Sequence, residues 1–594
     1  MRFKRIAIFL FLITFTTLIA VYCTFRPSPS ERIKSAFSDS LEELRQTVKE
    51  DFYSSVQKGK SDDIKKTFLK ARTSYKSIEY YIEYFFPSTA VMLNGAPIDE
   101  IELGENLIEN PTGFQVMEEF VYEPLTTESK AELLNEIKKM NNNLERISRF
   151  NEQYQITDAQ IFDAIRLEIF RITSLGITGF DAPIALHSLA EADASLKGID
   201  QALYIYHDNG ITKSISEART YLKKNSDFNA FNRLEFTTDY LQFISNNLDR
   251  LRKTKNIPTV ASGSGLNDQT INMFQRNAFN VNRFVGNSTL YYSKDKAMLG
   301  KVLFSDAILS DKGNRSCQSC HQQNLAFTDG LVKPNAQTKG QILERNTPTL
   351  NYASLQRGFF YDLKAGTLED QALDVIHHKE EMGGSLEAAA LRINQSPDYQ
   401  KLIKKAYGDS VSKINPWKIQ HALATYIRSL NPFSSRLDRY LRGEKNQLNS
   451  AEKEGYNLFM GKAKCGSCHF APIFNGTQSP MFAKSEAEVL GVPIAPDTVN
   501  AKIDPDLGRY ALYQYPQYKH SFKTPTLRNI SRTAPYMHNG VFKTLEEVID
   551  FYNRGGGTGI GIRLDNQTLS ADKLNLSKNE IQSIIKFLAT LEDH

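Results

Sequence analysis

The sequence predicts an all-α fold in which an N-terminal helical bundle is followed by two related domains. Apolar residues recur at three- and four-residue spacing through the first part of the chain, and strand patterns are scarce. One short Cys-x-x-Cys-His motif occurs twice in the second half, which indicates a repeated unit. A chain of 594 residues is long enough for several domains, each with a hydrophobic core of its own.

Residues 1–25 are expected to be a signal peptide or a membrane anchor. A basic start precedes an almost wholly apolar run from Ile6 to Tyr22, which is typical of export signals. The run is short for a membrane span, and its positive start places the N-terminus inside. A cleaved signal, an uncleaved anchor through residues 6–23 and a lipid on Cys23 are the three alternatives. Each predicts an exported, periplasmic or cell-envelope protein that contacts a membrane only through this segment.

Residues 30–257 are expected to form the helical bundle. Segments 40–45, 130–137 and 236–244 carry apolar residues at three- or four-residue spacing, which places them on one face of a helix. A small and polar stretch follows, Pro-Thr-Val-Ala-Ser-Gly-Ser-Gly. Residues 258–285 are therefore predicted to be a linker.

One pair of motifs in the bundle weakly resembles a known helical domain. Asn94-Gly-Ala-Pro is followed by a Gly-Phe-Gln-Val-Met-Glu segment that ends at Glu118, similar to the Gly-x-His-x-x-Glu region of imelysin-like domains. Gln115 stands at the histidine position, which argues against a metal site carried by that motif. We therefore expect a docking or spacer domain in which Phe114 and Met117 pack in the core.

The repeated motif is the strongest functional signal in the chain. Its two copies are Cys317-Gln-Ser-Cys320-His321 and Cys465-Gly-Ser-Cys468-His469. This is the pattern of covalent c-type haem attachment, in which the cysteines form thioethers and the histidine is the proximal iron ligand. Zinc binding or a thioredoxin-like redox site would explain the cysteines but not the histidine after each pair. Four of the five cysteines are used, so no pair is left for a structural disulfide.

The sequence therefore predicts two covalently bound c-type haems in two cytochrome c-like haem domains. Residues 286–442 are expected to form the first and residues 443–594 the second. The formal net charge of +4 is small for this length, and it predicts neither nucleic-acid binding nor an acidic partner.

More motifs follow in a fixed order in the second half of the chain. Among them are Leu299-Gly-Lys-Val-Leu-Phe-Ser-Asp, Arg345-Asn-Thr-Pro-Thr-Leu, Glu381-Met-Gly, Asp506-Leu-Gly-Arg and Ala534-Pro-Tyr-Met-His-Asn-Gly. On these motifs the chain resembles the bacterial dihaem cytochrome c peroxidase family, which includes the MauG-type enzymes. The resemblance implies a peroxide-reacting haem in the first domain and an electron-transfer haem in the second.

Glu381 matches the acid that the family places over the peroxide-reacting haem. A carboxylate there can move a proton between the two peroxide oxygens by general acid–base catalysis. A surface glutamate is the alternative, because Glu380 stands beside it. No histidine occurs between His321 and His377, so the distal histidine of many family peroxidases has no counterpart. We expect an open or water-bound haem at rest, unless His377 or its neighbour His378 is the ligand.

The resemblance also implies the sixth ligand of the second haem and a bridge between the two haems. Tyr552 falls at the ligand position, which is methionine in the peroxidases and tyrosine in MauG-type enzymes. A phenolate is a hard anionic donor that should lower the reduction potential. Met537 and Met481 are the alternative ligands. Tyr361 stands where the family has a tryptophan between the two haems. Together with Glu381 it is predicted to be a catalytic residue.

Two further features belong to the same resemblance. The only tryptophan, Trp417, is expected elsewhere, on a helix of the first haem domain. A calcium ion between the haem domains is implied at Asn346 through its side-chain oxygen, and at Thr533 and Pro535 through their carbonyl oxygens. Oxygen donors of this kind suit a hard cation.

The resemblance implies an exported dihaem peroxidase that reduces hydrogen peroxide with electrons from a small cytochrome c or cupredoxin. Peroxide-dependent oxidation of a partner protein, as in MauG-type enzymes, is the first alternative, and Tyr552 and the missing distal histidine favour it. A non-enzymatic dihaem electron carrier is the second alternative, and Glu381 argues against it.

Overall fold

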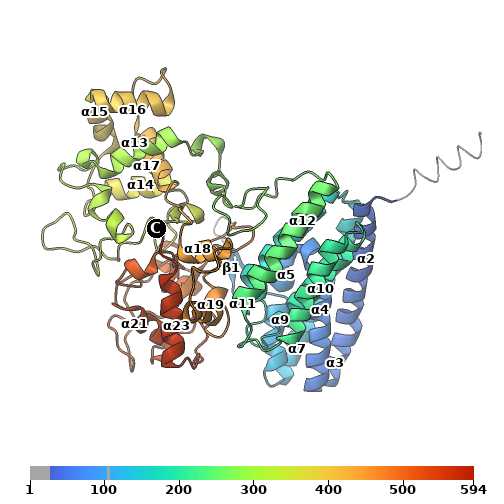
Figure 1. The fold of residues 1–594 in the computed structure, drawn as a ribbon. Coiled ribbons are helices and arrows are strands. Elements are labelled where there is room, and N and C mark those ends of the chain that lie inside the picture. The colour runs from blue at the N-terminus through green and yellow to red at the C-terminus, as the bar shows by residue number, and fades with distance from the viewer. Residues whose placement is uncertain (1–26, 103–106) are drawn as a thin grey trace, which may run out of the picture.

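The computed structural model describes residues 27–102 and 107–594, and these residues are mainly helical (Figure 1). Helices account for 54% of the structure and strands for 5%, which confirms the predicted fold class. The expected signal or anchor, residues 1–25 with Cys23, lies outside the described residues. None of the described helices is long and apolar enough to cross a membrane.

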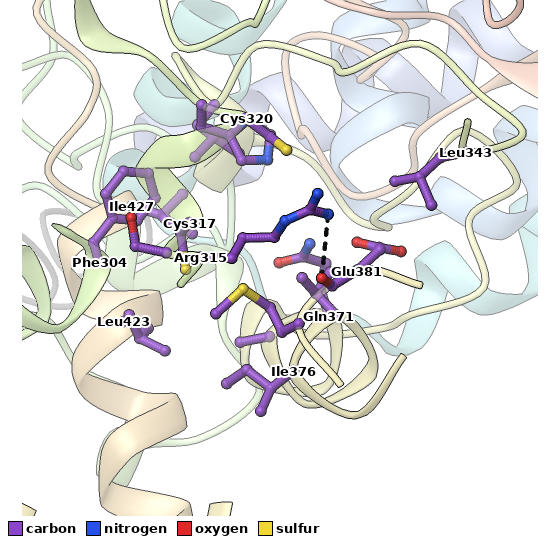
Figure 2. Close-up of a pocket in the computed structure, with 16 residues that line it drawn as sticks. Phe304, Arg315, Cys317, Cys320, Leu343, Gln371, Ile376, Glu381, Leu423 and Ile427 are labelled. Carbon is purple, nitrogen blue, oxygen red and sulfur yellow. Dashed lines mark hydrogen bonds between the residues drawn. The ribbon is translucent and has the colours of Figure 1, made fainter. Parts of the chain in front are cut away.

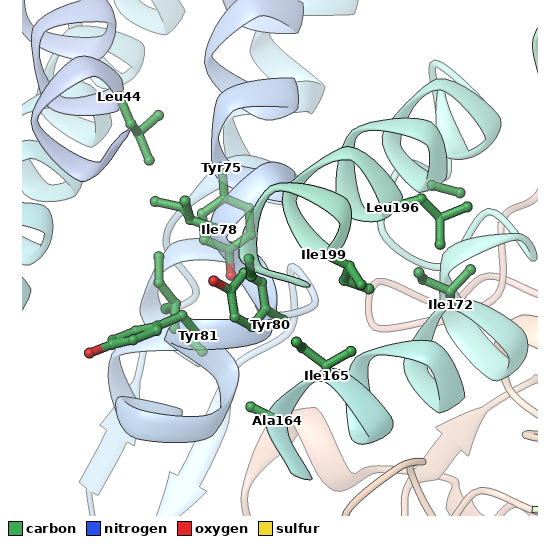
Figure 3. Close-up of a cluster of buried hydrophobic side chains, with 14 of the residues drawn as sticks. Leu44, Tyr75, Ile78, Tyr80, Tyr81, Ala164, Ile165, Ile172, Leu196 and Ile199 are labelled. Atoms are coloured by element: carbon green, nitrogen blue, oxygen red, sulfur yellow. The ribbon is translucent and has the colours of Figure 1, made fainter. Parts of the chain in front are cut away.

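Long helices form an N-terminal bundle: α2 (Pro29–Gln46), α4 (Ser61–Phe85), α7 (Thr127–Gln153), α8 (Asp158–Arg171), α9 (Ser188–Tyr204), α10 (Asn209–Lys224) and α12 (Gln242–Thr254). Capping boxes begin three of them, because Ser28, Thr126 and Thr157 each accept a hydrogen bond from the backbone N–H three residues further on. Buried side chains from several helices meet in one core, among them Ile165 and Leu196 (Figure 3).

Short elements complete the bundle: η1 (Thr47–Phe52), α3 (Tyr53–Lys58), α5 (Pro87–Asn94), α6 (Phe114–Tyr122), η2 (Ile172–Gly176), α11 (Arg233–Glu235) and η3 (Phe236–Leu241). The elements η1, η2 and η3 are π-helical turns. An antiparallel pair, β1 (Glu100–Glu102) and β2 (Leu107–Glu109), places Ile101 opposite Ile108. Phe114 and Met117 are fully buried in the bundle core, as predicted.

The elements around Cys317 are termed the first haem domain: α13 (Lys294–Ser305), η6 (Ala307–Leu309), η7 (Cys317–Ser319), η8 (Gln323–Leu325), η9 (Ala353–Leu355), α14 (Leu368–His377), α15 (Leu386–Gln395), α16 (Pro397–Tyr407) and α17 (Pro416–Ile427). Leu303, Ile376 and Leu423 lie in its hydrophobic core. Gly300 allows α13 to pack directly on α17, because a Cβ there would lie 1.9 Å from the carbonyl oxygen of Ala422.

The elements around Cys465 are termed the second haem domain: α18 (Arg436–Leu441), α19 (Ser450–Met460), η10 (Cys465–Ser467), β3 (Ala487–Val489), α20 (Tyr510–Tyr513), η11 (Pro516–Tyr518), β4 (Ser521–Lys523), η12 (Ile530–Arg532), α21 (Leu545–Asn553), α22 (Gly556–Gly559) and α23 (Lys578–Ala589). Gly455 repeats the arrangement of the first domain, because a Cβ there would lie 1.9 Å from the carbonyl oxygen of Ser583. In both domains a glycine on the helix before the motif therefore contacts the backbone of a later helix.

The segment predicted to be a linker, residues 258–285, packs onto the second haem domain. Leu266 and Phe274 are buried in the core of that domain. The segment ends in η4 (Val281–Phe284), and η5 (Ser288–Leu290) follows it. The chain between the bundle and the first haem domain is therefore packed along the second haem domain.

The helical bundle also shares the core of the second haem domain. Leu167, Phe170 and Leu234 from the bundle belong to the same hydrophobic cluster as Tyr456 and the rest of that domain's core. In Figure 1 the bundle lies beside α18 and α19, and the first haem domain, with α13 to α17, lies above the second in this view. The second haem domain is therefore the central part of the molecule.

Candidate functional site

The first Cys-x-x-Cys-His motif lies on a tight turn that directs its side chains into one cavity (Figure 2). The backbone N–H of His321 donates to the carbonyl of Cys317 at 2.9 Å and closes the turn. The residues around it are Phe304, Arg315, Ser316, Cys317, Cys320, His321, Leu343, Leu350, Gln371, Ala372, Val375, Ile376, Glu381, Met382, Leu423 and Ile427.

The His321 ring is oriented by a hydrogen bond. Its Nδ1 lies 2.9 Å from the carbonyl oxygen of Phe327, so Nδ1–H donates and Nε2 carries the free lone pair. Burial lowers the pKa of His321 and keeps the ring neutral, which is the form that ligates a metal.

The second motif has the same local geometry. The N–H of His469 donates to the carbonyl of Cys465 at 2.9 Å. Nδ1 of His469 lies 3.1 Å from the carbonyl oxygen of Pro525 and 3.3 Å from that of Phe474, so Nε2 is again free to bind iron. Burial lowers the pKa of His469 to about 4. Both histidines therefore fit the role of proximal ligand.

The cysteines of both motifs are enclosed by protein. Burial raises the pKa of Cys317 and of Cys465 to about 12. In residues 27–102 and 107–594, no three His, Cys, Asp or Glu side chains are arranged to hold a metal ion. The residues present fit two c-type haems, each with a cysteine pair to hold the ring and a neutral histidine to reach its iron.

Glu381 lies in the same cavity as Cys317, Cys320 and His321. Burial raises the pKa of its carboxyl group, and the charges of His378 and Lys364 act against that rise. Figure 2 shows Arg315 donating to the Glu381 backbone, with Nη1 3.3 Å from the carbonyl oxygen. A carboxylate held in this way can accept and release a proton inside the cavity.

The two histidines near Glu381 lie outside the cavity lining. His377 and His378 are both exposed. His321 is the one histidine among the described residues that line the cavity. Nδ1 of His378 lies 3.6 Å from Oε1 of Glu381, so this ring contacts the carboxylate from the solvent side. The open sixth position at the first haem stays a prediction.

Tyr552 lies on α21, beside the second motif. It packs against the same hydrophobic core as Cys465. Burial, together with the neighbouring thiols of Cys468 and Cys465, raises the pKa of its phenol. Met481 is 38% exposed, whereas Met537 is partly buried against the same core. Tyr552 and Met537 both remain near the second haem site.

Tyr361 lies where the two haem domains meet. Its carbonyl oxygen accepts a hydrogen bond from the backbone N–H of Lys523 on β4 at 2.7 Å. Burial raises the pKa of its phenol, and the positive charge of Arg345 acts against that rise. Trp417 lies on α17, where it stacks on His421 with ring centroids 5.1 Å apart. The structure thus places Tyr361, and not the tryptophan, at the domain contact.

Of the three residues predicted to bind calcium, Asn346 lies at the same contact. The N–H of Asn346 donates to the carbonyl of His538 at 2.7 Å, close in sequence to Thr533 and Pro535. The side-chain Nδ2 of Asn346 donates to Leu331 at 2.8 Å, which leaves its oxygen as the donor atom for a cation. Calcium binding stays a prediction.

Two cavity residues, Gln371 and Arg315, were absent from the predicted site. Gln371 lies on α14 in the cavity wall together with Ala372, Val375 and Ile376. These four positions have the three- and four-residue spacing of one helix face, which is the signal that would have found them. Arg315 holds the opposite wall by donating to the carbonyls of Asn335 and Ala336, and no local pattern predicts that contact.

The two cysteine pairs are consistent with c-type haems, and comparison with known proteins identifies the family of the chain. The family model of di-haem cytochrome c peroxidase matches residues 294–446. A cytochrome c peroxidase of Denitromonas iodatirespirans is 32% identical over 313 residues, which are 50% of this chain and 81% of that protein. The cytochrome c551 peroxidase of Nitrosomonas europaea is 34% identical over 50% of this chain and 80% of its own.

A methylamine utilization protein MauG of Methylorubrum extorquens is 31% identical over 50% of this chain and 78% of its own. The crystal structure of a MauG-like protein associated with microbial copper homeostasis is 30% identical, with a TM-score of 0.45 over 52% of this chain and 92% of that one. The chain belongs to the di-haem cytochrome c peroxidase family, whose members are oxidoreductases acting on peroxide. The matches cover the C-terminal half and leave the helical bundle unassigned.

Proposed function

We propose that this protein is an exported dihaem peroxidase that reduces hydrogen peroxide with electrons from a small cytochrome c or cupredoxin. The observation that carries the proposal is the cavity of the first motif, in which Glu381 faces the two cysteines and His321. A pure electron carrier has no use for a partly buried carboxylate there. Export is inferred from the leader and from c-type attachment, and calcium at Asn346 belongs to the same proposal.

Different residues of the cavity have different roles in peroxide reduction. A haem held by Cys317, Cys320 and His321 would supply the iron and the electrons for cleavage of the O–O bond. The Glu381 carboxylate accepts the proton of one peroxide oxygen and returns it to the other, which leaves as water. Arg315 fixes the backbone of Glu381, and apolar side chains such as Leu423 and Ile427 limit the water in the cavity.

The first experiment is an optical titration of the purified, fully ferric protein. We expect a high-spin component before addition, and an immediate spectral change after one equivalent of hydrogen peroxide without any reductant. If the spectrum changes only after one haem has been reduced, a ligand such as His378 occupies the sixth position of the first iron. Turnover with a reduced small cytochrome then tests the donor, and no turnover with any cytochrome or cupredoxin would contradict the peroxidase proposal.

Peroxide-dependent oxidation of a partner protein is the second candidate, and the position of Tyr552 favours it. A phenolate ligand disfavours the reduced form of the iron. The oxidising equivalents that come from peroxide would then remain available to oxidise a partner protein. The variant Tyr552→Phe should add a high-spin component at the second haem, whereas Met537→Leu should not. The reverse result would make Met537 the ligand and remove the support for this candidate. A mass change on a co-expressed partner would identify the substrate.

A further inference from the structure

Arg233 is a buried cation that has no carboxylate partner among the described residues. Its side chain is fully buried between the bundle and the second haem domain. Its guanidinium donates only to carbonyl oxygens, to Ile177 at 2.7 Å, Phe228 at 2.8 Å and Phe231 at 3.3 Å. The ring of Phe228 lies 4.4 Å from the guanidinium carbon. The positive charge is therefore held in place but is not neutralised.

Arg233 lies against the turn that leads into the second haem motif. A Cβ built at Gly461 would lie 2.4 Å from Nη1 of Arg233, so this glycine makes room for the guanidinium. The N–H of Lys464 donates to the carbonyl of Gly461 at 2.7 Å and closes a turn directly before Cys465. From the dimensions of such a turn, the charge lies within roughly 10–15 Å of the attachment site.

Other contacts of the bundle hold the same loop. The Lys464 Nζ donates to the carbonyl of Pro183 at 3.2 Å. The ring of Phe180 meets the ring of Phe470, which directly follows the proximal histidine, edge to face at 5.6 Å. Asn457, at the end of α19, accepts a hydrogen bond from the N–H of Leu234 at 3.0 Å. The helical bundle therefore packs against the loop that carries the second haem motif and against the helix before it.

A fixed charge in this place acts on the redox equilibrium of the haem. Burial lowers the pKa of Arg233 to about 10, so the side chain stays protonated at neutral pH. An added electron is stabilised by a nearby positive charge, and the stabilisation is large where little water screens it. The charge thus favours the reduced haem and opposes the effect of a phenolate ligand.

We propose that Arg233 raises the reduction potential of the second haem, and that the helical bundle tunes this haem by holding the charge against the Gly461–Cys465 loop. Arg233 is a positioning residue, because its positive charge acts on the haem only through the electrostatic field. The inference goes beyond peroxide chemistry, since it requires only a haem at the second motif. It would hold for an electron carrier as well as for a peroxidase.

A potentiometric titration of the holoprotein tests the proposal through the optical bands of each haem. Removing the charge in Arg233→Met should shift the second haem's reduction equilibrium about tenfold toward the oxidised form, ~59 mV lower for one electron. The first haem should change much less. Arg166→Met is the matched control, because Asp163 already neutralises that cation at 2.6 Å. Its potentials should equal those of the wild type.

Two further variants separate charge from packing. Arg233→Gln keeps hydrogen bonding to the carbonyls without the charge and should also lower the potential, which keeps the test available if Arg233→Met does not fold. Arg233→Lys keeps the charge and should restore most of the wild-type value. An unchanged second-haem potential in a folded neutral variant would overturn the proposal. So would an equal fall in the lysine variant, because packing alone would then explain it.

Discussion

Glu380 and Glu381 are neighbours in the sequence, but the fold gives them different surroundings. Both the N–H and the hydroxyl of Thr338 donate to the Glu380 carboxylate at 3.0 Å, and these bonds lower its pKa. Glu381 turns into the cavity, where burial raises the pKa of its carboxyl group. A raised pKa brings a carboxyl group closer to the range in which it both accepts and releases a proton.

The variant Glu381→Gln should therefore lose the reaction with peroxide while both haems stay attached. An amide has the shape of the carboxyl group but cannot accept the proton, and general acid–base catalysis contributes about 10²–10⁴-fold. Stopped-flow absorbance after mixing the ferric protein with hydrogen peroxide measures the rate. Glu387→Gln, at the exposed start of α15, is the control and should react like the wild type. A wild-type rate in Glu381→Gln would remove this residue from the mechanism.

His378 should set the pH range in which Glu381 is active. Its positive charge lowers the pKa of Glu381, so His378→Asn should let that pKa rise. The base form of Glu381 is present above its pKa, and the acid limb of the rate profile should move to higher pH. We expect a shift of roughly 0.2–0.7 pH units, the size of an exposed charge pair. His377→Asn is the control, and equal shifts in both variants would contradict the contact at 3.6 Å.

Individual site residues were predictable only where the chemistry lies within one short segment. Cys317, Cys320 and His321 are neighbours in the chain, so their pattern carries its own meaning. Arg315 and Gln371 enter the cavity from segments whose positions depend on the packing of α14 and of the loop near Ala336. No local pattern places Arg315, whereas the helix-face spacing within α14 marks Gln371 without showing which cavity it lines.

At the scale of helices and strands, two close helix contacts organise the two haem domains. Gly300 on α13 and Gly455 on α19 each lie directly against the backbone of a later helix. Each helix precedes a haem motif and carries core side chains, such as Leu303 and Tyr456. A change in either contact would therefore move the motif relative to its core.

The variants Gly300→Ala and Gly455→Ala should each destabilise the protein. The added methyl group would lie 1.9 Å from a carbonyl oxygen in both cases, and the backbone has to move to admit it. Overpacking of this kind costs about 1–3 kcal/mol. Chemical denaturation, followed by circular dichroism, measures the loss. Gly366→Ala is the control because a Cβ there has open space, and equal losses in the control would contradict the argument.

The helices were predictable because their signals are local. Capping residues such as Thr126 and Thr157 and the apolar spacing within each helix lie inside the segment that folds. Residues 258–285 were predicted to be a linker because the stretch with which they begin, Pro258 to Gly265, is small and polar. Composition does not say that Leu266 and Phe274 find places in the core of a distant domain, so their packing came from the structure alone.

At the scale of the whole molecule, partly buried ion pairs fix the relation between the two haem domains. Arg345 of the first domain contacts Asp362 at 2.6 Å and Asp506 of the second at 2.7 Å. Asp362 follows Tyr361, whose carbonyl is bound to β4 by Lys523. The order of the domains could be predicted from the two motifs, whereas this contact between the domains could not. Any electron path through Tyr361 depends on the geometry that these pairs maintain.

The variant Arg345→Met should weaken this contact between the two haem domains. We expect it to lower the free energy of unfolding by an amount that depends on pH. Burial alone would raise the pKa of Asp506, but hydrogen bonds from Arg345 outweigh it and hold the pKa low. A carboxyl with a depressed pKa stabilises the fold above its unfolded pKa of about 3.9, and the contribution is lost as the pH falls through the folded value. The variant should therefore be less stable than the wild type by about 1–3 kcal/mol at neutral pH.

The difference should shrink below about pH 4, because the wild type then loses the same interaction. Denaturation curves at pH 7 and at a pH below about 4, followed by the haem absorbance, give both values. Arg392→Met is the control, since this exposed arginine on α15 donates only to the carbonyl of Ile308 within its own domain. A loss that is equal at both pH values would mean that Arg345 acts by packing and not through Asp506. In that case Tyr361 would be positioned by its bond to β4 alone.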